Sequence, residues 1–499
     1  MTCIPLAPAL RLLVASLLAL AVPAFGQSAD HDRWYVLHLA GTRAGWMHTL
    51  QSTANGRITT TTRTELTIRR GAAALSVAVR SEFVETADGR PVRMLSSQSM
   101  GAAPVVSEWT FGPTDVTQSI KRGRNRPVTT VLSLPEGPLM APAAAARHVA
   151  ERIAAGDGTI AVRTLDPTIG AEPVTVTHTV LGREEVPVQG RPVAAVKLST
   201  VVSAVPGVTT ISHVDDQGLP LVTSTSLGGL QVTTTLADQA VARAPADGAA
   251  PELMHSTLVR PDRPIERARQ TRRASYLLSV PAGHELPELP TAGSQRTQRL
   301  SAQAARVRVL PAEPVVSPEA DPKAHLAANA SLDFADPAVA RLVARALKNA
   351  PADPAARAEA LRGFVSAHIR TKDLGVGFAG ASEVATSRQG DCTEHGVLLA
   401  AMLRADGIPS RVVTGLIYVD RLGPDRGVFG YHMWTQALLD LPTGRSWVDL
   451  DATLPPGAPF DATHIALGVS DLEDGKMPAD MAGLASLLGR LSIIVEAAE

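Results

Sequence analysis

The stretch RQGDCTEHGVLLAAMLRADGIPSR, residues 388–411, contains Cys392, one of only two cysteines in this chain of 499 residues. A Gly-Asp pair, typical of turns and helix caps, stands directly before this cysteine. Behind it, apolar residues recur at helical spacing over 397–403, and Asp406-Gly407 supplies a helix end. The stretch therefore predicts a buried helix with Cys392 in its first turn.

A cysteine at a helix start has two interpretations. Free amide N–H groups and the positive end of the helix dipole lower the pKa of a thiol there from about 8.5, and the thiolate is the nucleophilic form. Alternatively, Cys392 is a structural residue, because a free cysteine packs as a small hydrophobe. The position of Cys392 alone does not decide between these two roles. A catalytic cysteine also requires a base and an orienting group elsewhere in the chain.

A cysteine nucleophile needs a base and a group that orients the base. His432 opens a strand predicted at 429–441, and Asp451 ends a strand predicted at 444–453. A cysteine at a helix start, a histidine on one strand and an aspartate on the next make a workable triad. In it Cys392 attacks a carbonyl, His432 takes and returns the proton, and Asp451 holds the imidazole.

Other residues near these three are candidates for supporting contacts. Asp449 lies on the same strand face as Asp451, so spacing alone leaves it as an alternative carboxylate. His464 is expected to pack or to hydrogen-bond rather than to take part in catalysis. The candidate supporting residues are Asp391, His395, Trp434, Trp447 and Asp449.

Residues from about 335 to 470 resemble the transglutaminase-like superfamily, a papain-like group of Cys-His-Asp acyl-transfer enzymes. The matching residues are Gly390-Asp391-Cys392, Leu403-Arg404-Ala405 with Gly407-Ile408-Pro409-x-Arg411, Gly415, His432-x-Trp434 and Trp447-x-x-x-Asp451-x-Thr453. DCTEH and ATHIALG (462–468) resemble a bacterial branch of secreted members. The resemblance implies that Cys392, His432 and Asp451 form the triad. Thr386 stands where papain-type enzymes have an oxyanion glutamine, so the Cys392 backbone N–H is the expected oxyanion donor.

The rest of the chain predicts mostly β structure. Residues from about 33 to 240 alternate apolar and polar side chains, with abundant Val and Thr, which predicts antiparallel strands with one buried face. The segments 87–101 and 216–228 look alike, which hints at a duplicated β unit. The expected parts are a signal peptide at 1–26, a β-rich region at 27–241, a small β module at 253–310 and a transglutaminase-like domain at 331–499. The fold class is therefore multidomain, with an N-terminal antiparallel all-β region, a small middle β module and a C-terminal α+β domain.

The N-terminus predicts export. An apolar run follows Arg11, and Ala24 and Gly26 fit the small-x-small pattern of a signal peptide cleaved after Gly26, with an uncleaved anchor as the alternative. Removal of this segment takes Cys3 with it, leaves Cys392 as the one thiol and rules out an intramolecular disulfide. A periplasmic or extracellular location is expected, without a transmembrane helix after signal removal.

Charge and motifs limit the partners. The formal net charge of −1 gives no reason to expect nucleic acid or an anionic membrane surface as a partner. No cofactor is implied, because the sequence has neither an EF-hand-like run nor a Cys/His cluster with zinc-ligand spacing.

Two functions follow from these patterns. The first is an exported cysteine acyl-transfer enzyme that acts on a protein or peptide substrate, as a protease or amidase if water is the acceptor and as a transglutaminase if an amine is. The second is an envelope binding or scaffold protein with a vestigial transglutaminase-like domain, because the long β-rich region carries no catalytic signature.

Overall fold

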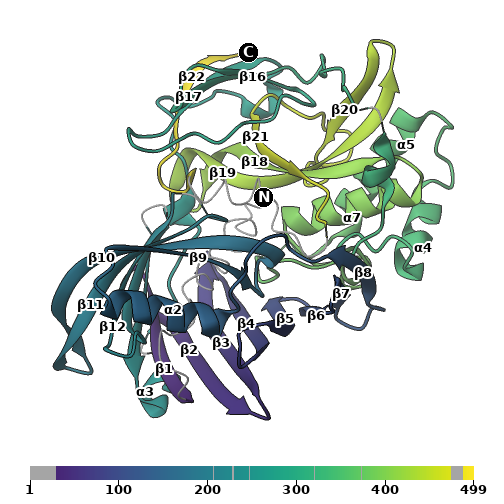
Figure 1. Ribbon diagram of the computed structural model, residues 1–499. Coiled ribbons are helices and arrows are strands. Elements are labelled where there is room, and N and C mark those ends of the chain that lie inside the picture. The colour runs from purple at the N-terminus through teal and green to yellow at the C-terminus, as the bar shows by residue number, and fades with distance from the viewer. Residues whose placement is uncertain are drawn as a thin grey trace.

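The fold is described from a computed structural model, in which a large sheet forms one lobe and helices with two smaller sheets form the other (Figure 1). The described residues are 30–205, 207–227, 230–246, 248–319, 321–372, 374–473 and 487–499. The predicted signal peptide at 1–26, together with Cys3, lies outside the described residues.

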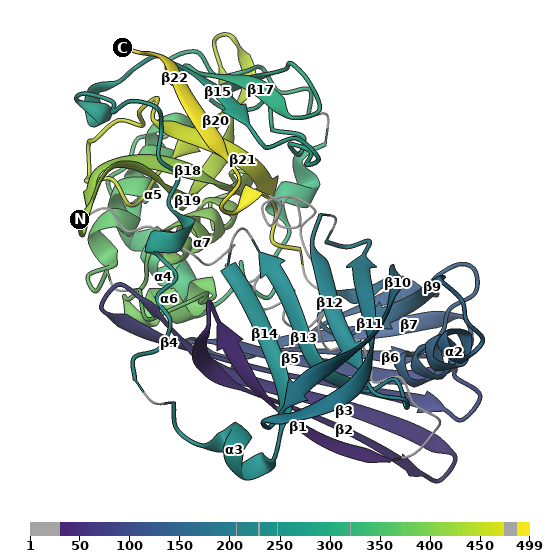
Figure 2. The ribbon, with the colours of Figure 1, turned by 90° about the vertical axis from the view of Figure 1, so that its left-hand side faces the viewer.

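One antiparallel sheet of 14 strands builds the N-terminal lobe (Figures 1 and 2). Its order is β8-β7-β6-β5-β4-β3-β2-β1-β14-β13-β12-β11-β10-β9, so the pairing of β1 with β14 joins two runs of sequential hairpins. The strands are β1 (His31–Leu39), β2 (Thr42–Ala54), β3 (Arg57–Arg70), β4 (Ala73–Thr86), β5 (Pro91–Met100), β6 (Val105–Phe111), β7 (Asp115–Arg122), β8 (Val128–Ser133), β9 (Thr159–Asp166), β10 (Gly170–Val188), β11 (Arg191–Val202), β12 (Thr209–Val214), β13 (Pro220–Leu227) and β14 (Leu230–Ala237).

Burial along these strands follows the predicted alternation. In β3 every second residue from Ile58 to Arg70 is buried, as the period of two in a half-buried strand requires. The last of these buried residues is an arginine, Arg70, at the end of β3 that faces the other lobe.

Two helices pack on this sheet. Helix α2 (Pro142–Ala154) lies in the chain between β8 and β9, and its alanine-rich face packs against apolar residues of β9 and β10. Small side chains on this face let the helix approach the strands closely. The short helix α3 (Gln239–Arg243) follows β14 and contacts β1 and β2.

A second sheet of four strands has the order β16-β17-β15-β22. Its strands are β15 (Ala274–Ser279), β16 (Gln295–Arg299), β17 (Ala304–Val309) and β22 (Ser492–Ala498). The predicted middle module at 253–310 thus receives its fourth strand from the far end of the chain, and Figure 2 shows β22 beside β15. The domain boundaries themselves stay predictions, as does the duplicated β unit.

The C-terminal α+β region places its helices against a third sheet, of order β20-β19-β18-β21. The helices are α4 (Pro337–Ala346), α5 (Pro354–His368), α6 (Ala381–Ser387) and α7 (Cys392–Ala405). The strands are β18 (Ser410–Leu422), β19 (Asp425–Leu441), β20 (Gly444–Leu450) and β21 (His464–Ser470). Three short 3-10 helices lie before them, η1 (His255–Thr257), η2 (Ala268–Gln270) and η3 (Pro322–Leu326). Asp336 and Asp353 cap α4 and α5.

Helix α7 occupies the centre of this region. It packs against β19 on one side and against α4, α5 and α6 on the others, and every residue from Cys392 to Arg404 is buried. The largest apolar core continues from here into the N-terminal sheet, where it includes Leu66 and Ile68. Helix α7 therefore belongs to a core that both lobes share.

The expected fold class is confirmed: an N-terminal antiparallel β region, further small sheets and a C-terminal set of helices with strands. Among the helices that the structure describes, none combines the length and the apolar character needed to cross a bilayer.

Candidate active site

Helix α7 begins at Cys392, as the sequence predicts, because a capping box precedes it. The Asp391 carboxylate accepts the Thr393 amide at 2.9 Å, and the Glu394 carboxyl accepts the Asp391 amide at 2.9 Å. Gly390 has a φ of +145°, and a Cβ there would lie 2.3 Å from the Glu394 side chain. Glycine thus leaves room for the cap that fixes Cys392 in the first turn.

The Cys392 thiol lies against strand β19. The backbone amide of Met433 donates to Cys392 Sγ at 3.1 Å, and the thiol is fully buried. A donor at the sulfur stabilises a thiolate more than a neutral thiol, because the charged form is the stronger acceptor. Since Met433 follows His432 in the chain, the strand that supplies this donor also carries the predicted base.

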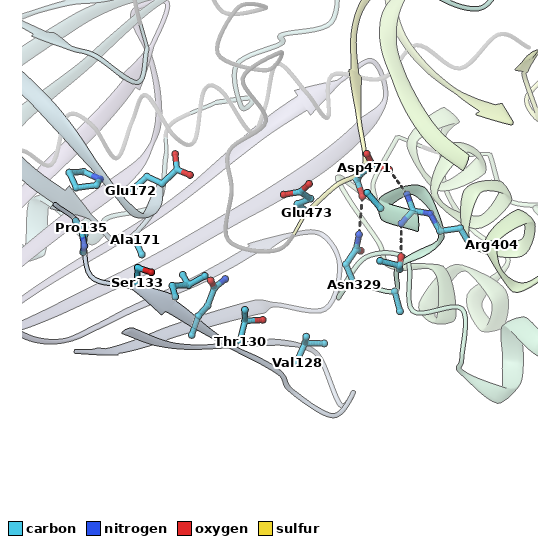
Figure 3. Close-up of a pocket in the computed structure, with 16 residues that line it drawn as sticks. Val128, Thr130, Ser133, Pro135, Ala171, Glu172, Asn329, Arg404, Asp471 and Glu473 are labelled. Carbon is cyan, nitrogen blue, oxygen red and sulfur yellow. Dashed lines mark hydrogen bonds and ion pairs between the residues drawn. The ribbon is translucent and has the colours of Figure 1, made fainter. Parts of the chain in front are cut away.

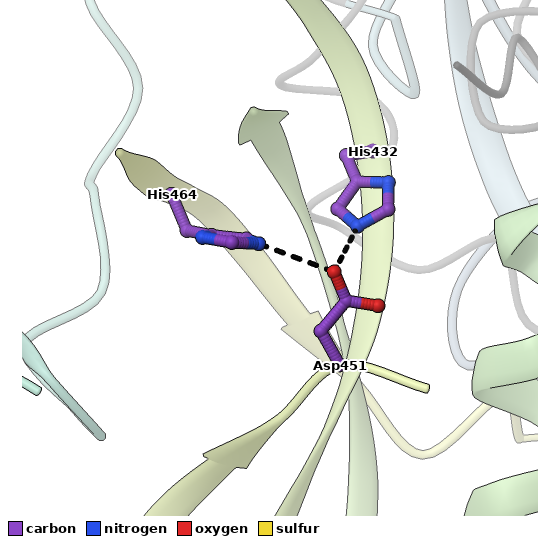
Figure 4. A group of neighbouring side chains, drawn as sticks. All are labelled: His432, Asp451 and His464. Carbon is purple, nitrogen blue, oxygen red and sulfur yellow. Dashed lines mark hydrogen bonds and ion pairs between the residues drawn. The ribbon is translucent and has the colours of Figure 1, made fainter. Parts of the chain in front are cut away.

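His432 and Asp451 are brought together (Figure 4). His432 Nε2 lies 2.9 Å from Asp451 Oδ2, and both side chains are fully buried. An ionised carboxylate can only accept hydrogen bonds, so the proton of the neutral imidazole lies on Nε2 and Nδ1 is the basic nitrogen. Nδ1 has no hydrogen-bond partner within the described part of the chain. This tautomer leaves His432 ready to accept a proton.

The Asp451 carboxylate is held by four hydrogen bonds. Oδ2 accepts from both His432 and His464, while Oδ1 accepts the Thr453 amide at 2.8 Å and the Thr453 hydroxyl at 2.7 Å. Burial alone would raise the pKa of Asp451, but the two neighbouring imidazoles hold it well below its usual range. Asp451 therefore stays ionised and fixed, as an orienting group requires.

His464 shares that carboxylate from the opposite side (Figure 4). Its Nε2 lies 3.2 Å from Asp451 Oδ2, and its Nδ1 lies 3.0 Å from the Asp461 carbonyl oxygen and 3.4 Å from Asp461 Oδ1. Burial opposes a charge on this ring, but the Asp461 and Asp451 carboxylates outweigh burial and raise the pKa of His464 to about 9. His464 is therefore an imidazolium at neutral pH. The predicted hydrogen-bonding role is present, whereas its link to Asp451 was missed, since the two residues stand far apart in the sequence pattern.

The same three side chains have the donor set of a metal site. Ring nitrogens of His432 and His464 and a carboxylate oxygen of Asp451 lie within 4.8 Å of one another. Two imidazoles and a carboxylate suit zinc and related metals. Here Nε2 of His432 and Nε2 of His464 already form hydrogen bonds with the Asp451 carboxylate, so a metal ion bound by these atoms would have to displace both hydrogen bonds.

Residues 341–452 match the family model of the transglutaminase-like superfamily. These residues form a transglutaminase-like domain. The match supports a cysteine-dependent enzyme, and it includes Cys392, His432 and Asp451. No curated protein matches the chain in sequence.

Three solved structures resemble parts of the chain. A beta-barrel-like protein with a domain of unknown function from Brucella abortus is 14% identical, with a TM-score of 0.34, covering 42% of this chain and 97% of that chain. A candidate cysteine protease from Cytophaga hutchinsonii is 13% identical, with a TM-score of 0.24, covering 44% and 83%. A candidate protease from Parabacteroides distasonis is 13% identical, with a TM-score of 0.19, covering 79% and 64%. At these TM-scores the family match, and not the structural resemblance, supports the assignment.

In the transglutaminase-like domain the alternative carboxylate, Asp449, accepts a hydrogen bond from a tryptophan instead of binding the histidine. Asp449 Oδ1 accepts from Trp434 Nε1 and from Gln436 Nε2, both at 2.8 Å, and its Oδ2 accepts the Ser294 amide at 2.7 Å. The Trp434 ring then stacks on His432, with centroids 6.0 Å apart. These contacts therefore link Asp449 to His432 through the Trp434 ring.

The remaining candidates divide into near and distant residues. Asp391 caps the helix, and its carbonyl oxygen lies 2.6 Å from Nδ1 of His395, whose pKa burial lowers to about 4. Trp447 does not reach the triad: its ring packs against Arg411 at 4.1 Å and against His325. It lies four residue steps before Asp451, a span of about 13 Å in an extended chain.

Thr386 does not replace the missing oxyanion glutamine. The Thr386 hydroxyl donates to carbonyl oxygens of its own helix, Ser382 and Glu383. The Cys392 amide, by contrast, stands at the first position of α7, where no carbonyl within the helix can accept it. It therefore remains the expected donor for an oxyanion.

Two of the cavities in the described part of the chain border the transglutaminase-like domain. The larger, of about 610 Å³, lies between the N-terminal sheet and the domain, where Arg404 donates to Asp471 at 2.6 Å (Figure 3). None of the three triad residues lines it. The smaller, of about 420 Å³, reaches Asp451 and Asp449 and is also lined by Phe460.

Proposed function

We propose that this chain is an exported cysteine acyl-transfer enzyme that acts on peptide or amide bonds through an acyl-thioester. The observation that carries the proposal is the 2.9 Å hydrogen bond from His432 on β19 to Asp451, which directly follows β20, because β19 packs against the helix that starts with Cys392. A cysteine kept only for packing would need neither a base with a fixed tautomer nor a carboxylate fixed to orient it.

In the first half of the proposed reaction the thiol proton of Cys392 passes to His432 Nδ1. The sulfur then bonds to the substrate carbonyl carbon, and the carbonyl electrons move to its oxygen, where the Cys392 amide stabilises the charge. His432 returns the proton to the leaving amine as the C–N bond breaks. Asp451 holds the imidazolium during the transfer without taking the proton itself.

In the second half an acceptor attacks the thioester, and His432 removes its proton. Water gives a carboxylic acid and a primary amine gives a new amide, while the sulfur leaves as the thiolate in both cases. The triad supplies the same chemistry for either acceptor. Protease or amidase action and transglutaminase action are therefore two outcomes of one proposed intermediate.

The proposal is tested by incubating the purified protein with a broad peptide library, with and without a primary amine. Mass spectrometry separates cleavage, deamidation and amine incorporation. We expect Cys392→Ala to abolish turnover, and His432→Ala to reduce it by about 10⁴-fold or more.

Two further variants separate the carboxylates. Asp451→Asn presents an amide N–H to His432 Nε2, which moves the ring proton to Nδ1 and removes the base, so a loss of similar size is expected. Asp449→Asn still accepts from Trp434 and should lose far less. Turnover that persists in Cys392→Ala would refute the proposal. A wild-type chain without turnover, together with a Cys392→Ala chain that retains its cellular role, would support the envelope-scaffold alternative.

A further inference from the structure

We propose that Arg70, on the N-terminal sheet, is a positioning residue for the Cys392 nucleophile, so that the β-rich region forms part of the active-site framework. The inference rests on the proposed function, because it assigns the β-rich region a part in the same reaction. It concerns a residue outside the transglutaminase-like domain at 341–452.

The contact itself is a buried ion pair between the lobes. Arg70 Nη2 lies 2.6 Å from Asp391 Oδ2, and both side chains are fully buried. Arg70 Nη1 also donates to the carbonyl oxygens of Leu374 at 3.0 Å and Val376 at 3.2 Å. One guanidinium therefore holds both the cap of α7 and the loop that leads to α6.

Asp391 connects this ion pair directly to the nucleophile. Its other oxygen caps the Thr393 amide, and its own amide donates to Glu394, which in turn accepts the Ala379 amide at 2.9 Å. Burial and the adjacent Asp391 charge raise the pKa of Glu394 well above its usual value. The first turn of α7 thus concentrates acidic groups next to the residue that has to become a thiolate.

The charged and titratable groups around this turn come from four parts of the fold. They are Asp391 at the N-cap of α7 with Glu394 and His395 in its first turn, Arg70 on β3, Lys372 before α6, and His432 on β19 with Asp451 after β20. Arg70 is the cation that touches the cap carboxylate in the described structure. A carboxylate buried without a cation is strongly unfavourable, and a like charge beside a thiol disfavours its ionisation.

Other contacts fasten the same loop to the sheet. The Gly377 amide donates to the Met100 carbonyl at 2.7 Å, and Arg122 donates to the Phe378 carbonyl at 3.0 Å. These contacts dock the lobes, but neither of them reaches the Asp391 carboxylate. Arg122 is buried like Arg70 and lies at the same interface, so it offers a matched control.

The test uses the full-length chain and two readouts. The pH profile of iodoacetamide labelling, followed on the peptide that contains Cys392, reports ionisation of the thiol without any substrate. Peptide turnover reports the reaction. Thermal unfolding identifies variants that are folded.

We expect Arg70→Met to move the labelling midpoint towards higher pH by about one unit or more. Its kcat should fall by about 100-fold, with a smaller change in KM, because the nucleophile is displaced. Arg70→Lys keeps the charge but not the fork of donors, so an intermediate result is expected. Arg122→Met should keep the wild-type midpoint even where it lowers the melting temperature.

The double variant Arg70→Met/Asp391→Asn removes both charges of the ion pair. Asparagine still caps the helix but carries no charge, so the midpoint should return towards the wild-type value. If Arg70→Met does not fold, Arg70→Lys and the double variant carry the test. Folded Arg70 variants with the wild-type midpoint and kcat would overturn the inference. If the labelling midpoint depends on Arg70 but the wild-type chain shows no turnover, the proposed function is refuted, and Arg70 keeps only an effect on the ionisation of the thiol.

Discussion

Asp451 is the residue on which the candidate site converges, because one carboxylate oxygen binds two imidazoles. In the proposed reaction His432 has to accept the thiol proton, whereas His464 already carries its extra proton at neutral pH. Arg269 compensates Asp461 at 2.8 Å, so His464 remains balanced between two carboxylates. His464 therefore fixes Asp451 without competing for the proton of the thiol.

The pKa of His464 predicts a pH-dependent stability. A histidine whose pKa is raised from 6.5 to about 9 in the folded protein contributes stability below pH 6.5, and that contribution is lost as the pH rises through 9. The full effect amounts to about 3 kcal/mol. We expect the free energy of unfolding of the wild type to fall more steeply between pH 6.5 and 10 than that of His464→Asn, as measured by urea denaturation.

The matched control is His178, a buried histidine whose pKa is lowered to about 4 by burial. It is neutral throughout this pH range, so His178→Asn should keep the wild-type slope. Equal slopes in the wild type and His464→Asn would contradict the prediction.

At the residue scale, the sequence motifs identify the candidate residues but not the contacts between their side chains. Cys392, His432 and Asp451 stand in recognisable motifs, and the structure places them at the start of α7, on β19 and directly after β20. Which carboxylate faces the imidazole could not be decided from spacing, because Asp449 and Asp451 share a strand face. The decision depends on Trp434, whose indole N–H engages Asp449.

At the scale of elements, β22 shows the limit of local patterns. Helix α7 was expected, because its capping signals lie within a few residues of its first turn. The partner of β22 is β15, which precedes the whole transglutaminase-like domain. Pairing between strands so distant has no local signature, so the middle module could not be completed from sequence.

This pairing predicts unequal effects of two adjacent isoleucines in β22. Ile493 is 2% exposed and faces the core, whereas Ile494 is 44% exposed. We expect Ile493→Ala to lower the free energy of unfolding by about 2–5 kcal/mol and Ile494→Ala by less than about 1 kcal/mol. Chemical denaturation measures both, and similar losses for the two variants would argue against the observed strand register.

At the scale of the whole molecule, the two lobes meet where glycines allow close approach. Gly101 directly follows β5 and has a φ of +68°, and a Cβ there would lie 2.3 Å from the Gly375 carbonyl oxygen. The ion pair between Arg70 and Asp391 lies in the same interface. Such contacts join residues hundreds of positions apart, which explains why the sequence left the role of the β-rich region open.

The interface predicts that Gly101→Ala weakens both stability and turnover. The added methyl forces the sheet away from the loop at 374–377, in addition to the strain of about 1–2 kcal/mol for alanine in a left-handed conformation. Gly41→Ala is the control, since Gly41 has a φ of +77° and nothing within 4 Å of an added Cβ. We expect Gly41→Ala to lose stability only, as measured by thermal unfolding and peptide turnover. Turnover lowered equally in both variants would contradict the proposed docking effect.

The pairing of β15 with β22 also sets an order of assembly during synthesis. Strand β15 leaves the ribosome before the whole transglutaminase-like domain, and its pairing edge stays open until β22 follows. An open edge that carries buried apolar residues such as Tyr276 and Leu278 is a template for pairing with other chains. A nascent chain that stalls inside the transglutaminase-like domain therefore exposes the unpaired edge of β15, where other chains can pair. Pairing with β22 covers this edge and ends the stage of synthesis at which the chain is prone to aggregate.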